Sequence, residues 1–376
     1  MSSSGLDWRR GMPDCWAVET GPPETQPLVT VVVPAFNAEA TLAETLRSIA
    51  AQTYRRLEIL IVDDGSTDAT PAIASDFCTA EPRARLISKE NGGVASARNR
   101  GIAEAAGAWV APVDADDLWH PAKIEKQVAA ALAAPEPPGF VYCWFRLIDA
   151  ESRIIGGGER WAVDGPALKQ LAYRNFVGNG SALLLSARAA REAGGYDESL
   201  RARQAEGCED IALQLQVAQR YPVAAVPAYL VGYRFHAASM SRNADRMFRS
   251  WQLTLERLRR DRAVPAGVLR WNLAIRQWGL AEARAIAGDR RGSLSSLAQA
   301  LRLDPARTGL HALYRTARLA ARLARGRRSL PPPLAFAKAD PYATIEFDAD
   351  ALAGFARLLE RFDQGRMARL AALERG

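Results

Sequence analysis

The sequence has no run of about 18 apolar residues, the length that a membrane-spanning helix needs. Its first ten residues contain no apolar segment of the kind that forms a secretory signal, so we expect none there. The four cysteines lack the spacing of a metal site, which favours a reducing compartment. Together these absences predict a cytoplasmic protein.

Signatures of three common enzyme classes are also missing. No G-x-G-x-x-G follows the first apolar run and no G-x-x-x-x-G-K-[ST] occurs, so dehydrogenases and P-loop phosphotransferases would lack their phosphate cradle. The G-x-S-x-G elbow of serine hydrolases is absent as well. The sequence therefore disfavours all three classes.

What is present is an alternation of strand and helix patterns. Residues 28–33 and 57–62 are apolar runs, which are typical of strands buried in a parallel sheet. The segment between them has helical spacing, and Thr41 with Glu44 is a candidate capping box at its start. This order predicts a Rossmann-like α/β fold with a mostly parallel central sheet flanked by helices.

Polar residues follow each expected strand, at 34–37, at 63–68 and, after a third apolar run, at 114–117. Ligands of such sheets bind at the carboxyl ends of the strands. Alternate residues of an extended chain face the same side, so Asp114 and Asp116 can converge on one Mg²⁺ or Mn²⁺ ion while Asp117 turns elsewhere. The alternative is that Asp116 or Asp117 caps a helix beginning at Leu118.

Four motifs in this region resemble the ordered signature of glycosyltransferase family 2. They are Val33 to Glu39, Val62 to Asp68, Asn91 to Gly101, and Asp114-Ala115-Asp116-Asp117. A fifth segment, Gly195 to Leu200 followed by Gly207 to Asp210, is similar to the acceptor-side motif of that family. The resemblance covers residues 28–245, and the order of the motifs makes it specific. It implies a GT-A fold that inverts configuration while transferring a sugar from a nucleotide-sugar donor.

The resemblance also implies a donor site. In it Asp116 is the main metal ligand, Asp114 lies nearer the ribose, and a divalent cation, Mn²⁺ or Mg²⁺, stabilises the departing diphosphate. Arg98 either reaches the diphosphate or pairs with a nearby carboxylate. A structural loop role stays open for Glu39. The implied nucleotide-sugar contacts are Pro34, Ala35, Phe36, Asn37, Glu39, Asp64, Asn91, Arg98, Asp114, Ala115 and Asp116.

Inversion by direct displacement needs a base for the acceptor hydroxyl, and a carboxylate suits this role. Asp210 is the candidate base, with Glu209 as a second catalytic carboxylate. Both open a helical run, where we expect the helix dipole to lower the carboxylate pKa and keep the group ionised. The alternative is structural, since two acids are common in the first turn of a helix.

The end of the expected catalytic domain holds further candidates. His236 is one of only three histidines, and the resemblance makes it a possible third metal ligand. A loop histidine that is merely hydrogen-bonded or solvated is the alternative. Arg242 could neutralise the diphosphate, and residues 178–181 are positioned as a strand entry on the acceptor side.

The last third of the chain is basic and helical in pattern. Between Trp251 and Leu330 there are 17 arginines, no lysine and five acids, so the basicity of the chain is concentrated there. Residues 271–305 resemble one tetratricopeptide-type hairpin, which we expect to dock because a free solenoid needs about three repeats. A helix at 310–328 could lie on anionic lipid or form a solvated bundle face. Nucleic-acid binding is disfavoured because aromatic residues are sparse there.

The sequence thus predicts a loosely ordered lead-in (1–27), a GT-A catalytic domain (28–245) and a basic helical extension (246–376). The expected reaction moves a sugar, with a UDP-sugar as the expected donor, to a saccharide or lipid-linked saccharide. We expect it in the cytoplasm or on the inner face of the cytoplasmic membrane, in bacterial cell-envelope polysaccharide biosynthesis. The alternatives are an idle GT-A scaffold or membrane-associated interaction protein, and a nucleotidyltransferase, which would need a glycine-rich basic loop at 34–37.

Overall fold

The structure, a computed structural model, describes residues 26–158, 160–235, 243–325, 334–341, 343 and 353–375. Residues 1–25 of the predicted lead-in lie outside this part. The strands are β1 (Val29–Ala35), β2 (Leu57–Asp63), β3 (Ala84–Ser88), β4 (Trp109–Pro112), β5 (Leu118–Trp119), β6 (Phe140–Ile148), β7 (Ile154–Gly157), β8 (Leu183–Ser186) and β9 (Val223–Arg234). The helices of the first two thirds are α1 (Leu42–Ala50), α2 (Thr70–Ala80), α3 (Val94–Glu104), α4 (Lys123–Ala133), α5 (Leu168–Tyr173), α6 (Ala187–Glu192), α7 (Ser199–Ala202) and α8 (Glu209–Ala218).

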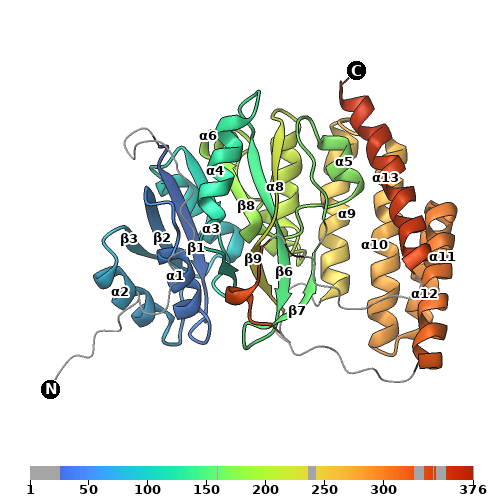
Figure 1. Ribbon diagram of the computed structural model, residues 1–376, viewed down its shortest axis with the longest axis horizontal. Helices are drawn as coiled ribbons and strands as arrows, with labels where there is room; N and C mark the ends of the chain where they lie inside the picture. The colour runs from blue at the N-terminus through green and yellow to red at the C-terminus, as the bar shows by residue number, and fades with distance from the viewer. Residues whose placement is uncertain are drawn as a thin grey trace.

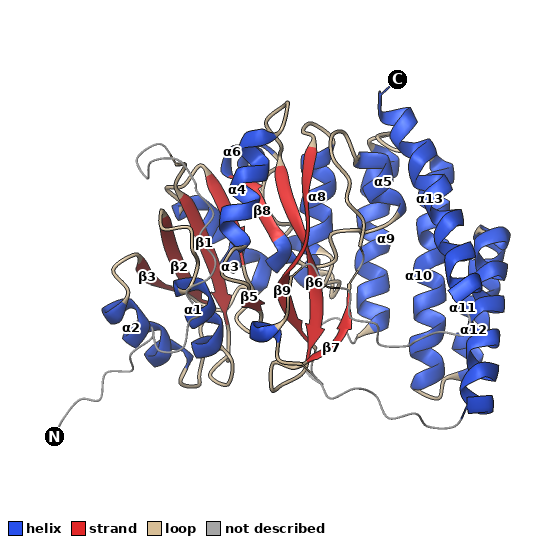
Figure 2. Ribbon diagram, in the orientation of Figure 1, coloured by secondary structure: helices blue, strands red, loops and turns tan. Residues whose placement is uncertain are grey.

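The nine strands of the described residues form one sheet in the order β3-β2-β1-β4-β8-β6-β9-β5, with β7 on β6. Strands β3, β2, β1 and β4 are parallel, as are β6 and β9, whereas β8 runs antiparallel between the two groups. Helices lie along this sheet (Figure 2). The predicted α/β fold with a mostly parallel sheet is therefore confirmed, and the carboxyl ends of β1, β2, β4, β6 and β9 share one edge.

The apolar runs of the sequence form the core because both faces of the central strands are covered. Every residue of β1 is buried, and Leu42, Leu46 and Ile49 of α1 belong to the same core. Gly101 of α3 lets that helix approach β1 closely, since a Cβ there would lie 2.3 Å from a methyl group of Val32. This close packing fixes where α3 begins, and therefore where its first turns meet the sheet edge.

The C-terminal extension is helical, as predicted, and packs against the sheet region. It consists of α9 (Ala244–Arg260), α10 (Ala266–Ile286), α11 (Arg290–Leu303), α12 (Pro305–Arg325) and α13 (Ala353–Arg375), with a 3₁₀ turn at Phe336–Lys338. A helical hairpin, α10 and α11, stands where one was expected, and its likeness to a tetratricopeptide unit stays a prediction. The extension lies at the end of the molecule opposite β3 (Figure 1).

One hydrophobic core runs across the predicted boundary at residue 245. Trp251 and Leu255 of α9 and Met367 and Leu370 of α13 belong to the same buried cluster as the sheet. A buried carboxylate, Asp363, adds polar contacts to this junction, which are described below. Within the described part of the chain, the extension thus shares a core with the sheet region.

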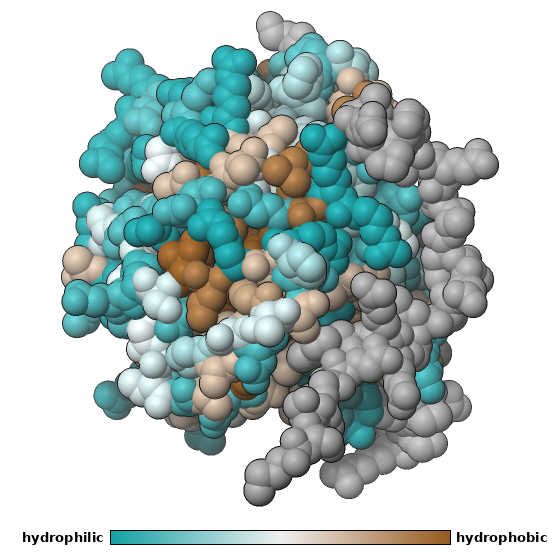
Figure 3. Space-filling model, turned by 90° about the vertical axis from the view of Figure 1, so that its left-hand side faces the viewer, coloured by the Kyte–Doolittle hydropathy of each residue, from teal (hydrophilic) through white to brown (hydrophobic). Residues whose placement is uncertain are grey.

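The face at the β3 end is largely hydrophilic, with hydrophobic side chains gathered in small patches near its centre (Figure 3). None of the described helices is both long and apolar enough to cross a membrane.

Candidate active site

The loop after β4 brings the acidic cluster to the sheet edge and turns Asp117 inward. The Asp117 side chain is fully buried, and its two oxygens accept hydrogen bonds from the Ser181 hydroxyl (2.5 Å) and the Arg234 backbone N–H (2.9 Å). Burial, followed by the charges of Asp116 and Asp114, raises the pKa of Asp117 well above its ordinary value. Asp117 is therefore an anchor for the loop.

The capping alternative for this cluster was wrong. Leu118 and Trp119 form strand β5, paired with β9, and the next helix begins only at Lys123. Asp114 and Asp116 remain half-buried at the edge, while Asp117 points elsewhere, as the alternation of an extended chain predicts.

Arg98 of α3 joins the carboxylates that the sequence analysis predicts for the donor side and for the acceptor side. Its Nη2 donates to Asp114 Oδ1 at 2.5 Å, and its Nη1 lies 2.9 Å from Asp210 Oδ1 at the start of α8. The Arg98 side chain is 3% exposed, against 29% for Asp114 and 23% for Asp210. Its guanidinium also lies 5.2 Å from the centre of the Tyr196 ring. The predicted pairing of Arg98 with a nearby carboxylate is thus present, in duplicate.

Burial and neighbouring charges shift the pKa values of Arg98 and Asp210. Although burial alone would lower the pKa of Arg98, Asp114 and Asp210 raise it well above its ordinary value. Burial raises the pKa of Asp210 to about 6, against the opposing effect of Arg98. The expectation that the helix dipole would lower this pKa was wrong, because desolvation outweighs it. A carboxylate with a pKa of about 6 is still mostly ionised at neutral pH and is well matched to a general base.

Several buried polar atoms of the cluster have no hydrogen-bond partner among the described residues. They are Arg98 Nε, Tyr196 Oη and Asp210 Oδ1, the last of which contacts Arg98 as an ion pair without hydrogen-bond alignment. Buried polar atoms in proteins are rarely left unpaired, so their concentration here is typical of a functional site. Gly180 leaves room beside them, since a Cβ there would lie 2.6 Å from Asp210 Oδ1.

Glu209, the second predicted catalytic carboxylate, has a different environment from Asp210. Its side chain is 2% exposed, and both oxygens accept from the backbone N–H of Gly207, at 2.9 and 2.8 Å. Burial raises its pKa as well. Glu209 therefore holds the loop that precedes α8, and Asp210 is the carboxylate that contacts Arg98.

Asp64 lies at the end of β2 and organises the turn that precedes α3. Its Oδ1 accepts from Lys89 Nζ (2.6 Å) and the Gly92 N–H (2.9 Å), and its Oδ2 accepts from the Gly93 N–H (2.7 Å). Asn91 in the same turn accepts from Arg201 Nη2 at 2.6 Å. The turn is thus bound both to the sheet edge and to helix α7.

The remaining predicted donor contacts divide into buried and exposed residues. Pro34 and Ala35 lie inside β1 and are buried, whereas Phe36 is 50% exposed and Asn37 is exposed beside it. Glu39 accepts from the Ala69 N–H at 3.0 Å, which supports its structural alternative. Ala115 is buried, and its carbonyl accepts from the hydroxyls of Thr41 (2.9 Å) and Thr45 (3.0 Å).

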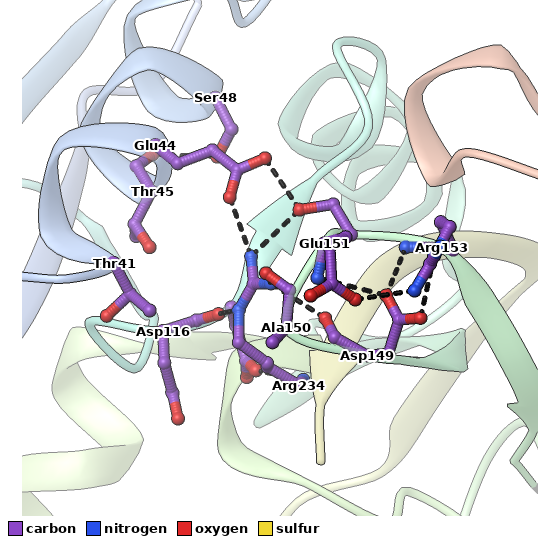
Figure 4. Close-up of polar contacts among 12 residues, drawn as sticks. Thr41, Glu44, Thr45, Ser48, Asp116, Asp149, Ala150, Glu151, Arg153 and Arg234 are labelled. Atoms are coloured by element: carbon purple, nitrogen blue, oxygen red, sulfur yellow. Dashed lines mark hydrogen bonds and ion pairs between the residues drawn. The ribbon is translucent and has the colours of Figure 1, made fainter. Parts of the chain in front are cut away.

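Arg234, at the end of β9, is a functional candidate that the sequence analysis missed. It is 1% exposed and its guanidinium donates to the carbonyl of Asp116 (2.7 Å) and to Glu44 Oε2 (2.7 Å). It also donates to the carbonyls of Asp149 and Ala150 and to the Ser152 hydroxyl (Figure 4). The available signal was an arginine directly after a buried apolar run, which needs several partners to be buried.

This network also overturns the predicted capping box. Thr41 precedes α1, but its hydroxyl donates to the Ala115 carbonyl and makes no cap, while Glu44 turns to Arg234. The first turn of α1 is thus used to hold the acidic loop. In Figure 4 the Asp116 carboxylate points away from the Arg234 guanidinium, which binds only its carbonyl.

The third predicted metal ligand, His236, and Arg242 lie outside the described residues. Among the residues that the structure describes, no group of three His, Cys, Asp or Glu side chains is arranged as a complete metal site. The half-buried Asp114 and Asp116 nevertheless offer the hard oxygen ligands that Mg²⁺ and Mn²⁺ prefer, and such ions often take further ligands from water and phosphate. The donor set therefore fits a divalent cation shared with a substrate.

Comparison with known proteins finds relatives of the sheet region. Residues 30–188 match the family model described as glycosyl transferase family 2. An uncharacterised glycosyltransferase of Rickettsia typhi is 32% identical over 178 residues, 46% of this chain and 55% of that protein. Chondroitin synthase of Escherichia coli is 31% identical over 39% of this chain and 21% of its own. The chain spans about half the length of the first curated relatives it matches.

Solved structures share the fold. TarS 1–349 of S. aureus in complex with UDP-GlcNAc superposes with a TM-score of 0.56 at 16% identity, covering 75% of this chain and 82% of that one. The mannosyltransferase PcManGT of Pyrobaculum calidifontis, in complex with GDP-Man and Mn²⁺, gives 0.52 at 24% identity over 84% of this chain and 85% of that one. Both cover most of this chain, including part of its last third.

Proposed function

Because residues 30–188 match the glycosyltransferase family 2 model, we propose that the protein transfers a sugar from a nucleotide-diphosphate donor to a saccharide or lipid-linked saccharide. The observation that carries the proposal is the chain of contacts from Asp114 through Arg98 to Asp210. It links the expected donor edge to a carboxylate with a pKa of about 6. A UDP-sugar is the donor we expect, in line with the UDP-GlcNAc bound by TarS, although PcManGT binds GDP-Man.

A divalent cation, Mn²⁺ or Mg²⁺, is the cofactor we propose, with Asp116 and Asp114 as its protein ligands. When bound, it would offset the negative charge that develops on the leaving diphosphate. Arg98 fixes the position of Asp114 through its 2.5 Å contact, so the donor edge is organised before substrate binds. The Mn²⁺ in the PcManGT complex is consistent with this assignment.

Asp210 is the proposed base of an inverting displacement. Its carboxylate takes the proton of the acceptor hydroxyl, whose oxygen forms a bond to the anomeric carbon. The bond between that carbon and the diphosphate oxygen breaks, and its electron pair leaves with the diphosphate. The cation of Arg98 opposes the effect of burial on Asp210 and so keeps enough of it ionised at neutral pH.

The test of the donor site is a calorimetric titration of UDP, GDP, CDP and dTDP into the full chain, with and without Mn²⁺. We expect metal-dependent binding of one diphosphate, weakened about tenfold or more in Asp116→Ala because a ligand is lost. Asp76→Ala, at an exposed position of α2, is the matched control. Failure of all four nucleotides under both conditions would favour the idle scaffold instead.

The extension offers a surface for a lipid-linked acceptor. Ile286 and Leu294 are 89% and 67% exposed, and the exposed Arg290 and Arg291 lie between them in the chain. Exposed apolar side chains flanked by arginine suit an anionic membrane surface. We expect sedimentation with anionic vesicles that Leu294→Glu weakens and Leu132→Glu, at an equally exposed position of α4, does not. Equal binding of both variants would contradict this location.

A further inference from the structure

A cavity of about 670 Å³ lies between the sheet and the helical extension. One wall comes from the ends of β6 and β9 and from the segment after β7, with Phe145, Trp161, Tyr233 and Phe235. The opposite wall comes from α12 and α13, with Tyr314 and Gln364. Because β6 and β9 run parallel to β1, this cavity opens at the same sheet edge as the acidic cluster.

The chemistry of the walls is aromatic with balanced charge. Phe145 and Tyr233 pack edge to face with ring centres 5.8 Å apart. The carbonyl of Trp161 accepts from Tyr142 Oη (3.0 Å) and Trp144 Nε1 (3.1 Å), which fixes the backbone that carries its indole. The charged groups of the lining are two arginines and two acids, Arg160, Arg174, Glu360 and Asp363.

These features select a neutral, amphipathic ligand. A sugar ring has apolar C–H faces, which pack on aromatic rings, and hydroxyl edges, which need hydrogen-bond partners such as the Gln364 amide. The arginines and acids cancel, so the cavity gives no net attraction to a strongly anionic polymer. The volume falls in the range that is usual for pockets holding a small organic ligand.

Contacts connect the cavity to the proposed base. Phe145 packs against Gly178, where a Cβ would lie 2.2 Å from its ring. Two residues further on, Gly180 lies against the carboxylate of Asp210. On the other side, Phe235 directly follows Arg234, whose backbone N–H binds Asp117. The segment from Gly178 to Gly180 thus borders the cavity at one end and the base at the other.

We propose that this cavity binds the saccharide of the acceptor, a neutral oligosaccharide held between the catalytic domain and the extension. The inference rests on the proposed function and adds to it the acceptor class and the residues that select it. It also gives the docked extension a role, since Tyr314 of α12 supplies one wall.

The test adds neutral trisaccharides of glucose, galactose, mannose and N-acetylglucosamine to the full chain. Saturation-transfer NMR and tryptophan fluorescence measure their binding. We expect at least one to bind, and Trp161→Ala and Tyr314→Ala each to weaken it about tenfold or more. Tyr221→Ala, an aromatic residue outside the cavity, is the matched control and should bind as the wild type does.

Nucleoside diphosphate is titrated into the same samples so that the two proposals fail separately. Wild type that binds the nucleotide but none of the trisaccharides would overturn the cavity assignment. So would cavity variants that bind saccharide as well as wild type, or that lose both ligands together. Saccharide binding that depends on Trp161 and Tyr314 without any nucleotide binding would support the cavity and contradict the proposed function.

Discussion

The ionisation of one side chain, Asp210, decides when the proposed reaction can run. Burial raises its pKa, and Arg98 limits the rise by pairing with it at 2.9 Å. Asp114 shares the same arginine, so the base and the donor edge are electrostatically linked. Replacing Arg98 should therefore affect both carboxylates.

A pH dependence follows from the raised pKa. The base is active only when ionised, so kcat/KM should fall about tenfold per pH unit below about 6 and level off above it. Asp210→Glu should retain measurable activity, and the pH at which its kcat/KM begins to fall should shift. A profile that is flat between pH 5 and 8 in wild type would show that Asp210 is not the titrating base.

At the scale of elements, Arg234 of β9 joins three segments that are distant from it in the sequence. Its guanidinium reaches the loop after β4, α1 and the turn between β6 and β7, at Asp116, Glu44 and Asp149 respectively. No local pattern in the sequence requires these elements to meet. The arginine therefore fixes the height of the acidic loop above the sheet edge.

Replacing Arg234 should destabilise the fold. Arg234→Met removes the hydrogen bonds that a side chain 1% exposed donates to three backbone carbonyls and to Glu44, so we expect a loss of about 2–3 kcal/mol in the free energy of unfolding. Chemical denaturation measures it. Arg188→Met, whose side chain is 81% exposed in an i,i+4 pair with Glu192, should cost about 0.5 kcal/mol or less. Equal effects of the two variants would contradict the role of Arg234.

The elements themselves were largely predictable, whereas the contacts between them were not. The apolar runs at 28–33 and 57–62 form β1 and β2, because a strand that is buried on both faces is a continuous apolar run in the sequence. The capping-box prediction failed because contacts distant in the sequence compete with the local one. The Thr41 hydroxyl donates to the Ala115 carbonyl, and Glu44 accepts from Arg234. The same holds for Asp210, whose pKa depends on burial that no short motif encodes. The aromatic cavity needs Phe145 and Tyr314 to meet, which only the docked extension achieves.

At the scale of the whole molecule, a buried ion network joins the extension to the catalytic region. Asp363 of α13 accepts from Tyr173 Oη and Arg174 Nη1 of the catalytic region, both at 2.5 Å, and from Arg307 Nε of α12 at 2.8 Å. Arg366 of α13 lies 4.1 Å from the centre of the Trp271 ring. Arg174 and Asp363 of this junction also line the aromatic cavity.

Breaking the network should loosen the extension. Although burial alone would raise the pKa of Asp363, hydrogen bonds and charge from Arg307 and Arg174 hold it below its ordinary value. Its contribution to stability is therefore present above the pKa of the unfolded chain, about 3.9, and is lost as the pH falls further. We expect Asp363→Ala to cost about 3–5 kcal/mol, with earlier proteolysis between the domains. Unchanged melting at neutral pH would contradict the network.

The most direct test of the account is turnover by Asp210→Asn, which keeps the size of the side chain while removing the base. With the donor that the nucleotide titration selects, product release at pH 7.5 would be measured beside nucleotide binding. The account predicts binding within twofold of wild type and turnover reduced about 10²–10⁴-fold. Undiminished turnover by Asp210→Asn would contradict the assignment of the base and, with it, the proposed mechanism.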